Sequence, residues 1–243
     1  MTAQFVLPGD HVDLNAFPRN EKKPLRLGPG LKVDPPSTLI PTVAGALLSD
    51  PRKNLVWVEQ GAGRYIASAG DLVIGTVQRS AGDIYIVSLS DYTLAATLHN
   101  LSFEGATKKT RPQLAPGALV YARVSGAHRY MDAELECVSA STGKADGLGP
   151  LTGGMVFGIS LGMARRLLMP KVVQDGKMIV LEELGAGGVA FETAVGRNGK
   201  LWVASERMAI VIAVGRAVVE TDEQNLDVKA QKKLVRRILE ELK

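Results

Sequence analysis

SFEGATKKTRPQLAPGALVYARV, residues 102–124, places Lys108, Lys109 and Arg111 in a proline-bounded loop between two strand-like runs. Little acidic charge lies close to this cluster in the sequence. A basic loop on a small barrel is a means of holding a phosphate backbone. Because runs of charge are usually solvated surface, RNA contact and plain surface both remain open interpretations of these residues alone.

Strand-like runs on both sides of this loop predict the barrel. They are separated by Gly, Asp or Pro and cover residues 71–80, 83–90, 92–98, 118–124 and 133–141. Five short strands that close on themselves suggest an OB-type barrel. Gly75 would ease a tight bend in the first strand. The run KADGLGPLTGG at 144–154 is Gly-rich and lacks bulky apolar periodicity, which predicts a domain boundary.

The segments before and after the barrel differ from it in composition and in predicted secondary structure. Eight of the twelve prolines fall in the first 51 residues, which predicts short strands and extended loops, with LVWV at 55–58 the clearest strand. After the boundary we expect α+β structure: strands at 155–159, 191–195 and 200–204, and helices at 161–168, 179–184, 206–220 and 229–243. The helix at 206–220 is apolar nearly all round and is therefore expected to be buried. The predicted fold is mostly β plus α+β, in domains 1–65, 66–145 and 150–243.

Composition and charge allow an RNA-binding protein and argue against a disulfide-bonded or membrane-spanning one. The chain has 243 residues, is 46% hydrophobic and carries a net charge of +4, which is compatible with an RNA partner. Cys137 is the sole cysteine, so an internal disulfide or zinc cluster is excluded and a reducing compartment fits. The first residues lack a basic-then-apolar signal, and the apolar run at 208–219 is too short to span a bilayer. We expect a soluble intracellular protein.

Motifs for enzymatic chemistry are weak. GISLG at 158–162 matches the nucleophile-elbow pattern around Ser160, but all three histidines precede it, whereas hydrolases of that class place the histidine after the serine. Ser160 is therefore predicted to cap the helix that follows. GAGGVA at 185–190 has the wrong flanking elements for a dinucleotide site. Alternating Asp132, Glu134 and Glu136 are predicted to face solvent. We predict no catalytic residue, metal site or cofactor.

GRNG at 196–199 is a GXXG tetrapeptide, which in KH domains joins two helices and clamps a nucleotide backbone. Here it lies between two strand-like runs, and Asn198-Gly199 in that position indicates a hairpin turn, since both residues accept a positive φ. We interpret Gly196, Asn198 and Gly199 as a structural turn rather than an RNA clamp. Trp202 follows the turn and is predicted to pack in a core or domain contact rather than stack on a base.

The order of the segments and many of their residues closely resemble one family, the RNA exosome cap subunit called ribosomal RNA-processing protein forty. The similarity runs in order along nearly the whole chain. FEGATKKTRP at 103–112 and GRNGKLWV at 196–203 are its most specific parts. LPGD at 7–10, LGPGL at 27–31, RYIASAGDLVIGTV at 64–77 and SLGMARRLL at 160–168 also match.

The resemblance implies an N-terminal docking domain, an S1-type OB barrel and a C-terminal KH domain. Such proteins are non-catalytic; they sit on a ring of RNase PH-like subunits beside other S1-domain cap subunits and help form the RNA entry pore. Associated nucleases degrade the RNA, and the family is nuclear (nucleolar) and cytoplasmic. The TKKTR loop would face single-stranded RNA, with Arg79, Arg123 and Arg129 as weaker candidates for the same surface. The alternative is a free-standing S1/KH RNA-binding regulator. No membrane partner is expected.

Overall fold

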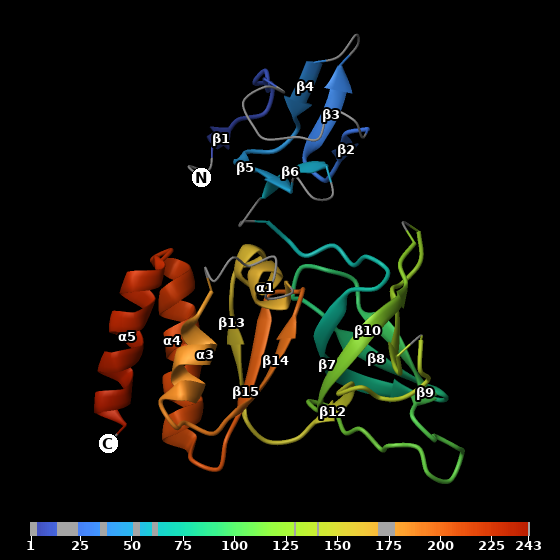
Figure 1. The fold of residues 1–243 in the computed structure, drawn as a ribbon. Coiled ribbons are helices and arrows are strands. Elements are labelled where there is room, and N and C mark those ends of the chain that lie inside the picture. Colours follow the sequence, from blue (N-terminus) through green and yellow to red (C-terminus); the bar gives the residue numbers. More distant parts are fainter. Residues whose placement is uncertain are drawn as a thin grey trace. The chain divides into compact units, whose positions relative to one another are not determined.

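The computed structural model describes residues 4–13, 24–34, 38–50, 54–59, 63–128, 130–139, 141–169 and 178–242. The chain divides into two compact units, Met1–Gly63 and Arg64–Lys243. The first unit contains strands alone among its described elements, and the second contains a barrel followed by an α+β domain (Figure 1).

The N-terminal unit is strand-rich, as predicted. A four-stranded sheet has the order β1 (Gln4–Val6), β5 (Gly45–Asp50), β6 (Leu55–Glu59) and β2 (Arg26–Leu27). Between β2 and β5 in the sequence, β3 (Leu31–Asp34) pairs with β4 (Thr38–Pro41) in a separate two-stranded sheet. Alternate residues of β6 face inward, which is the period expected of a half-buried strand. The small core consists of Val6, Val12, Leu39, Leu47, Val56 and Val58.

The second unit begins with the predicted OB-type barrel. Its strands are β7 (Leu72–Ala81), β8 (Ile84–Ser88), β9 (Ala96–Phe103), β10 (Leu119–Gly126) and β11 (Glu134–Cys137). They pair in the order β11-β9-β8-β7-β10, and a further pairing between β11 and β10 closes the sheet on itself. The third strand starts at Ala96 instead of residue 92, because the Ser90 hydroxyl and carbonyl accept the amides of Tyr92 and Thr93 and hold this segment in a turn.

The interior of the barrel requires a glycine at one point. Gly75 lies on β7, and a Cβ added there would come within 2.2 Å of Val87 Cγ1 on β8. The Val87 side chain therefore fills the space that a side chain at position 75 would need. Val73, Val87 and Val120 are fully buried around this point and belong to the barrel core.

One strand was not expected from the sequence. β12 (Gly149–Leu151) lies inside the Gly-rich run in which a domain boundary was predicted. It pairs with β10 and extends the barrel sheet, with Pro150 opposite Val120. A glycine-rich stretch can form a strand here because β10 supplies a ready partner for its backbone.

The C-terminal domain is α+β, as predicted. Its elements are β13 (Met155–Gly158), α1 (Leu161–Leu168), α3 (Val180–Ala186), β14 (Glu192–Gly196), β15 (Lys200–Ala204), α4 (Met208–Glu223) and α5 (Val228–Glu241). The strands form an antiparallel sheet in the order β13-β15-β14. Helix α5 is amphipathic: it buries Leu234, Val235 and Ile238.

Helix α4 departs from the expectation that it is buried on all sides. Val211, Val214 and Val218 are buried, but the side chains of Met208 and Ile212 are 57% and 47% exposed. These two lie four residues apart on one face, which the neighbouring elements leave uncovered. No helix in the described part of the chain is long and apolar enough to cross a membrane.

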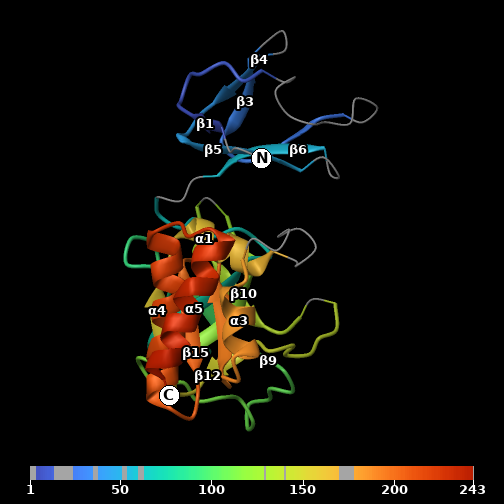
Figure 2. The ribbon, with the colours of Figure 1, turned by 60° about the vertical axis from the view of Figure 1, so that its left-hand side comes forward.

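The C-terminal sheet buries both of its faces. Leu201 and Val203 on β15 point to the core with α1, α3, α4 and α5, while Trp202 between them points to β7 and β10 of the barrel. The ribbon shows the helices on one side of this sheet and the barrel on the other (Figures 1 and 2). A strand covered on both faces reads as a continuous apolar run, which explains the sequence KLWVA.

Candidate nucleic-acid interface

The basic loop joins β9 to β10 and has a defined shape. Lys108 and Lys109 are the central residues of a turn that the hydroxyls of Thr107 and Thr110 stabilise, with their Oγ1 atoms 2.8 Å apart. The amides of Thr110 and Arg111 donate to the Thr107 carbonyl at 3.1 and 2.9 Å. Both lysines are exposed. The turn therefore presents two neighbouring positive charges to solvent without a covering side chain.

A barrel tyrosine fixes the returning arm of this loop. The Tyr85 ring is 4% exposed on β8, and its hydroxyl donates to the Pro112 carbonyl at 2.8 Å. The same oxygen accepts the Leu114 amide at 3.3 Å. Sequence reasoning placed Tyr85 only in a strand, because neither loop partner is close to it in the sequence.

We expect Tyr85→Phe to loosen the loop while keeping the ring in the core. Removing the hydroxyl leaves the Leu114 amide without its acceptor, at a cost of about 1–1.5 kcal/mol. Hydrogen exchange at that amide should therefore become about tenfold faster. Tyr121→Phe is a matched control, because the Tyr121 hydroxyl donates to Val195 instead. Equal protection of Leu114 in Tyr85→Phe and the native chain would contradict this role.

Arg111 has an acidic neighbour that the local sequence did not reveal. Its guanidinium lies 3.3 Å from the carboxylate of Asp83, which belongs to the turn between β7 and β8. The Asp83 side chain is 81% exposed, so water screens the pair and its contribution is small. The pair orients Arg111 beside the two lysines, and a phosphate could replace Asp83 at little cost.

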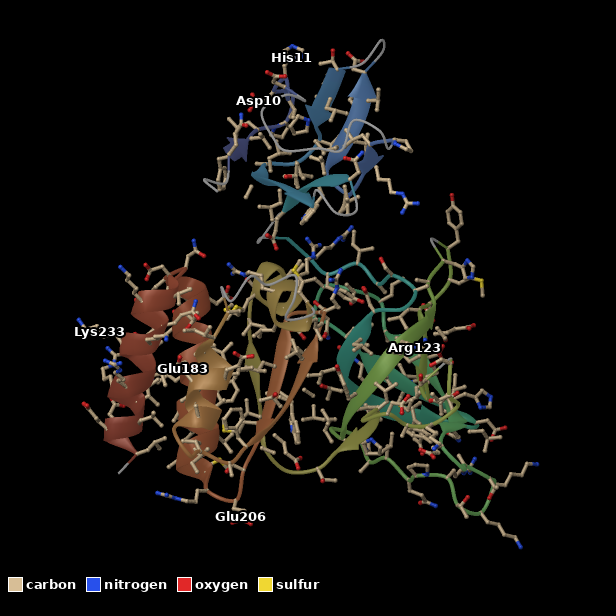
Figure 3. All side chains as sticks on the ribbon, in the orientation of Figure 1. Asp10, His11, Arg123, Glu183, Glu206 and Lys233 are labelled. Carbon is tan, nitrogen blue, oxygen red and sulfur yellow. The ribbon has the colours of Figure 1, made fainter. Side chains whose placement is uncertain are left out.

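The remaining predicted arginines lie in different places. Arg79 is exposed near the end of β7, and the loop base lies close because the Gly117 amide donates to Val77 at 2.7 Å. Arg123, labelled in Figure 3, lies opposite Leu72 at the other end of β7. It is half-buried and forms an ion pair with Glu136 on β11. Arg129 lies outside the described residues. The structure thus brings Lys108, Lys109, Arg111 and Arg79 to one end of the barrel and keeps Arg123 away.

The GRNG segment forms the hairpin between β14 and β15, in a three-residue form. The Gly199 amide donates to the Gly196 carbonyl at 3.0 Å, and Gly196 pairs with Lys200 across the strands. Of these residues only Gly199 has a positive φ, at 74°, whereas the sequence suggested one at Asn198 as well. A turn followed by one left-handed glycine is the usual three-residue hairpin.

Asn198 does not take the positive φ that the sequence suggested, and its side chain contacts the barrel. Its side chain is 7% exposed. Its Oδ1 accepts the Ile74 amide at 3.2 Å, and its Nδ2 donates to the carbonyls of Ile74 at 2.8 Å and Leu89 at 2.7 Å. The tetrapeptide therefore faces the barrel, and its amide groups are engaged there.

The same hairpin holds the segment that leads into the barrel. The Arg197 amide donates to Leu72 at 2.7 Å, and its guanidinium lies 3.4 Å from Asp71. The Tyr65 hydroxyl donates to the other oxygen of Asp71 at 2.9 Å. Burial, with the Asp71 charge, raises the pKa of Tyr65, so this hydroxyl remains a donor at physiological pH.

Groups that could carry enzymatic chemistry have structural partners. The Ser160 hydroxyl accepts the Met163 amide at 3.0 Å, which confirms the helix cap, and donates to Asp222 at 2.7 Å. Burial raises the pKa of the Cys137 thiol to about 12, so it stays protonated. Within the described ranges no group of His, Cys, Asp and Glu is arranged to hold a metal ion.

A closed OB-type barrel with a basic loop, packed on a β-α-α-β-β-α-α domain, is typical of the class of multidomain RNA-binding proteins. Family models agree: "Exosome complex exonuclease Rrp40 N-terminal domain" matches residues 25–64, "Exosome complex component RRP40, S1 domain" residues 65–149, and "KH domain" residues 154–207. The barrel is therefore an S1 domain and the α+β domain a KH domain.

Curated relatives identify the family. The chain is 35% identical over 243 residues to exosome complex component RRP40 of Saccharomyces cerevisiae, covering 98% of this chain and 96% of the relative. It is 37% identical over 218 residues to that of Schizosaccharomyces pombe, covering 88% and 86%. The chain belongs to the exosome complex component RRP40 family. A crystal structure assigned as an exosome complex RNA-binding protein shares the fold, with a TM-score of 0.57 at 22% identity, covering 74% of this chain and 97% of that one.

Proposed function

We propose that this chain is a non-catalytic, RNA-binding cap subunit of an RNA exosome. The relatives named above are exosome components, and the matched S1 and KH domains are RNA-binding modules. The chain would stabilise a ring of RNase PH-like subunits, next to other S1-domain caps, and guide single-stranded RNA into the ring pore. Associated nucleases would carry out 3′-to-5′ processing and degradation, in the nucleus (nucleolus) and cytoplasm. The domain limits we propose are 1–65, 66–145 and 150–243.

The observation that carries this proposal is the fixed shape of the basic loop. Lys108 and Lys109 project from a hydrogen-bonded turn, and Arg111 is oriented beside them by Asp83. Charges held in this way attract phosphates without reading bases, because the attraction depends on the backbone alone. A subunit that must accept many RNA sequences needs this kind of contact.

Other residues have secondary places in the proposal. Arg79 would extend the phosphate-binding surface at the same end of the barrel, and Arg129 remains a prediction. Arg123 already pairs with Glu136, so it would join β10 to β11 more than bind RNA. The GRNG hairpin would set the angle between the S1 and KH domains, because Asn198 is committed to the barrel.

Charge reversal tests the loop. We expect Lys108→Glu, Lys109→Glu and Arg111→Glu together to lower the affinity of the assembled complex for single-stranded RNA by about tenfold or more, and to flatten its salt dependence. Assembly should be spared, because the loop is exposed and these side chains belong to no core cluster. Binding is measured by fluorescence anisotropy at several salt concentrations, and assembly by co-purification with the ring subunits.

A matched control changes the same charge elsewhere. Lys229, Lys233 and Arg236 are exposed on α5, and Lys233 projects from that helix in Figure 3. Reversing these three should leave RNA affinity within about twofold, since α5 lies on the side of the KH sheet that faces away from the barrel and salt screens the remaining interaction (Figure 1). An unchanged affinity of the loop variant would refute the proposed RNA contact. A chain that purifies from its own cells without ring subunits would instead indicate the free-standing regulator.

A further inference from the structure

A loop near the end of the S1 domain, the linker loop (Ser139 and residues 141–146), leads toward the KH domain and carries a lysine. The Ser139 amide donates to the Lys144 carbonyl at 2.7 Å, and the Gly143 amide donates to Ser139 at 2.8 Å. The Thr142 hydroxyl accepts the Lys144 amide at 3.3 Å and donates to Asp146 at 2.8 Å. These bonds fix the backbone of Lys144, whose side chain is exposed.

This linker loop is attached to the start of the basic loop. Glu104 is the first residue after β9, and its Oε2 accepts the Ala145 amide at 2.7 Å. Ala145 follows Lys144 directly, and Glu104 precedes Lys108 by four residues. Four residues span at most about 14 Å, and the turn at Thr107–Thr110 shortens that distance. Lys144 is therefore held within a short reach of the lysines on the basic loop.

The charges around this point are mixed: the basic residues Lys108, Lys109, Arg111 and Lys144 outnumber the carboxylates of Asp83, Glu104 and Asp146 by one. Of the nearby carboxylates, Asp83 faces Arg111, Glu104 is used by a backbone amide, and Asp146 accepts from Thr142. In the described part of the chain, Lys144 forms no ion pair with any of them. An exposed lysine that forms no ion pair remains available to donate to a phosphate.

We propose that Lys144 is a further phosphate-binding residue, so that the RNA surface extends from the basic loop onto the linker loop at the end of the S1 domain. This inference rests on the proposed RNA contact of the basic loop. An OB barrel binds about 4–16 nucleotides of single strand, so one strand can cross both loops. Glu104 would be the positioning residue that keeps the linker, and with it Lys144, beside the loop.

The test compares Lys144→Glu with Lys233→Glu in the full-length chain, using a fluorescein-labelled single-stranded oligouridylate as the probe. Lys144→Glu should weaken binding about threefold or more at low salt, and the slope of log K against log salt should fall by about 0.7, the value for one phosphate of a single strand. Lys233 is an exposed lysine on α5, and its reversal should change neither quantity. Both variants should keep the native unfolding temperature.

A second pair of variants tests the positioning role. In a Glu104→Ala background, the linker loses its attachment, so Lys144→Glu should weaken binding by a smaller factor than in the native background. If the triple loop reversal weakens binding and Lys144→Glu does not, the inference about Lys144 is wrong while the proposed RNA contact stands. If neither weakens binding, the proposed contact itself is wrong.

Discussion

Trp202→Ala is expected to lower the free energy of unfolding of the unit Arg64–Lys243 by about 3–5 kcal/mol, the range for a buried tryptophan. The ring is 6% exposed and packs between the KH sheet and the barrel, against Ile74 and Ala194. Its Nε1–H also donates to the Gly153 carbonyl at 2.9 Å. Alanine would therefore leave a cavity in the contact between the domains and remove the hydrogen bond to Gly153.

Calorimetry of the full chain measures this effect. Trp202→Phe should cost less, because it keeps most of the packing and loses the hydrogen bond to Gly153. Trp57→Phe is the control: Trp57 is half-buried on β6 in the separate N-terminal unit, so the transition of the barrel–KH unit should not move. A Trp202→Ala chain with the native melting temperature would show that the domain contact does not depend on this ring.

Asn198→Ala is expected to have a comparable effect, although it removes a smaller side chain. The substitution leaves three buried backbone groups without a partner, namely the amide and carbonyl of Ile74 and the carbonyl of Leu89. Each such group costs about 1–3 kcal/mol, so three of them give an expected total loss of about 3–9 kcal/mol. Asn198→Asp should be at least as harmful, because a carboxylate would face two carbonyl oxygens.

The geometry explains why an amide is needed at this position. Thr76 pairs with Ser88, the last residue of β8, so the strand partner of Ile74 would come two residues beyond the end of β8. The Asn198 amide occupies that place and offers the acceptor and donor that a strand would have offered. It thereby continues the ladder of β7 from another domain.

A neighbouring residue in the same turn gives the control for Asn198. Arg197 forms a half-exposed ion pair with Asp71, and such a pair contributes about 0–1 kcal/mol, so Arg197→Ala should destabilise the unit only slightly. Hydrogen exchange at the Ile74 amide separates the two variants, because protection should be lost in Asn198→Ala and kept in Arg197→Ala. Equal protection in both would refute the bridging role of Asn198.

Local signals were sufficient for much of the fold and for part of the site. Strand and helix periodicity located the elements of the barrel and the KH domain, and a serine before LGMARRLL predicted the cap that Ser160 forms. The basic loop was also recognised from its sequence. In each case the information lies within a few consecutive residues, where backbone preference and side-chain spacing act directly.

The sequence was a poor guide where a residue depends on a distant partner. β12 was not predicted because it forms a strand only by pairing with β10. The exposed face of α4 was not predicted because the neighbouring elements determine which of its faces is covered. The acidic partner of Arg111 was missed for the same reason, since Asp83 is 28 residues away. None of these relations leaves a periodic pattern in the residues themselves.

The sequence by itself determined the elements, the position of the GRNG hairpin and the presence of a basic loop, because φ preferences and apolar spacing are properties of short segments. Only the tertiary structure decided what these parts do. In it Asn198 hydrogen-bonds to Ile74, 124 residues away. Tyr85 hydrogen-bonds to the basic loop, and Glu104 hydrogen-bonds to the linker loop. Such hydrogen bonds join groups that meet only when the barrel has closed and the KH domain has packed against it, so no local pattern encodes them.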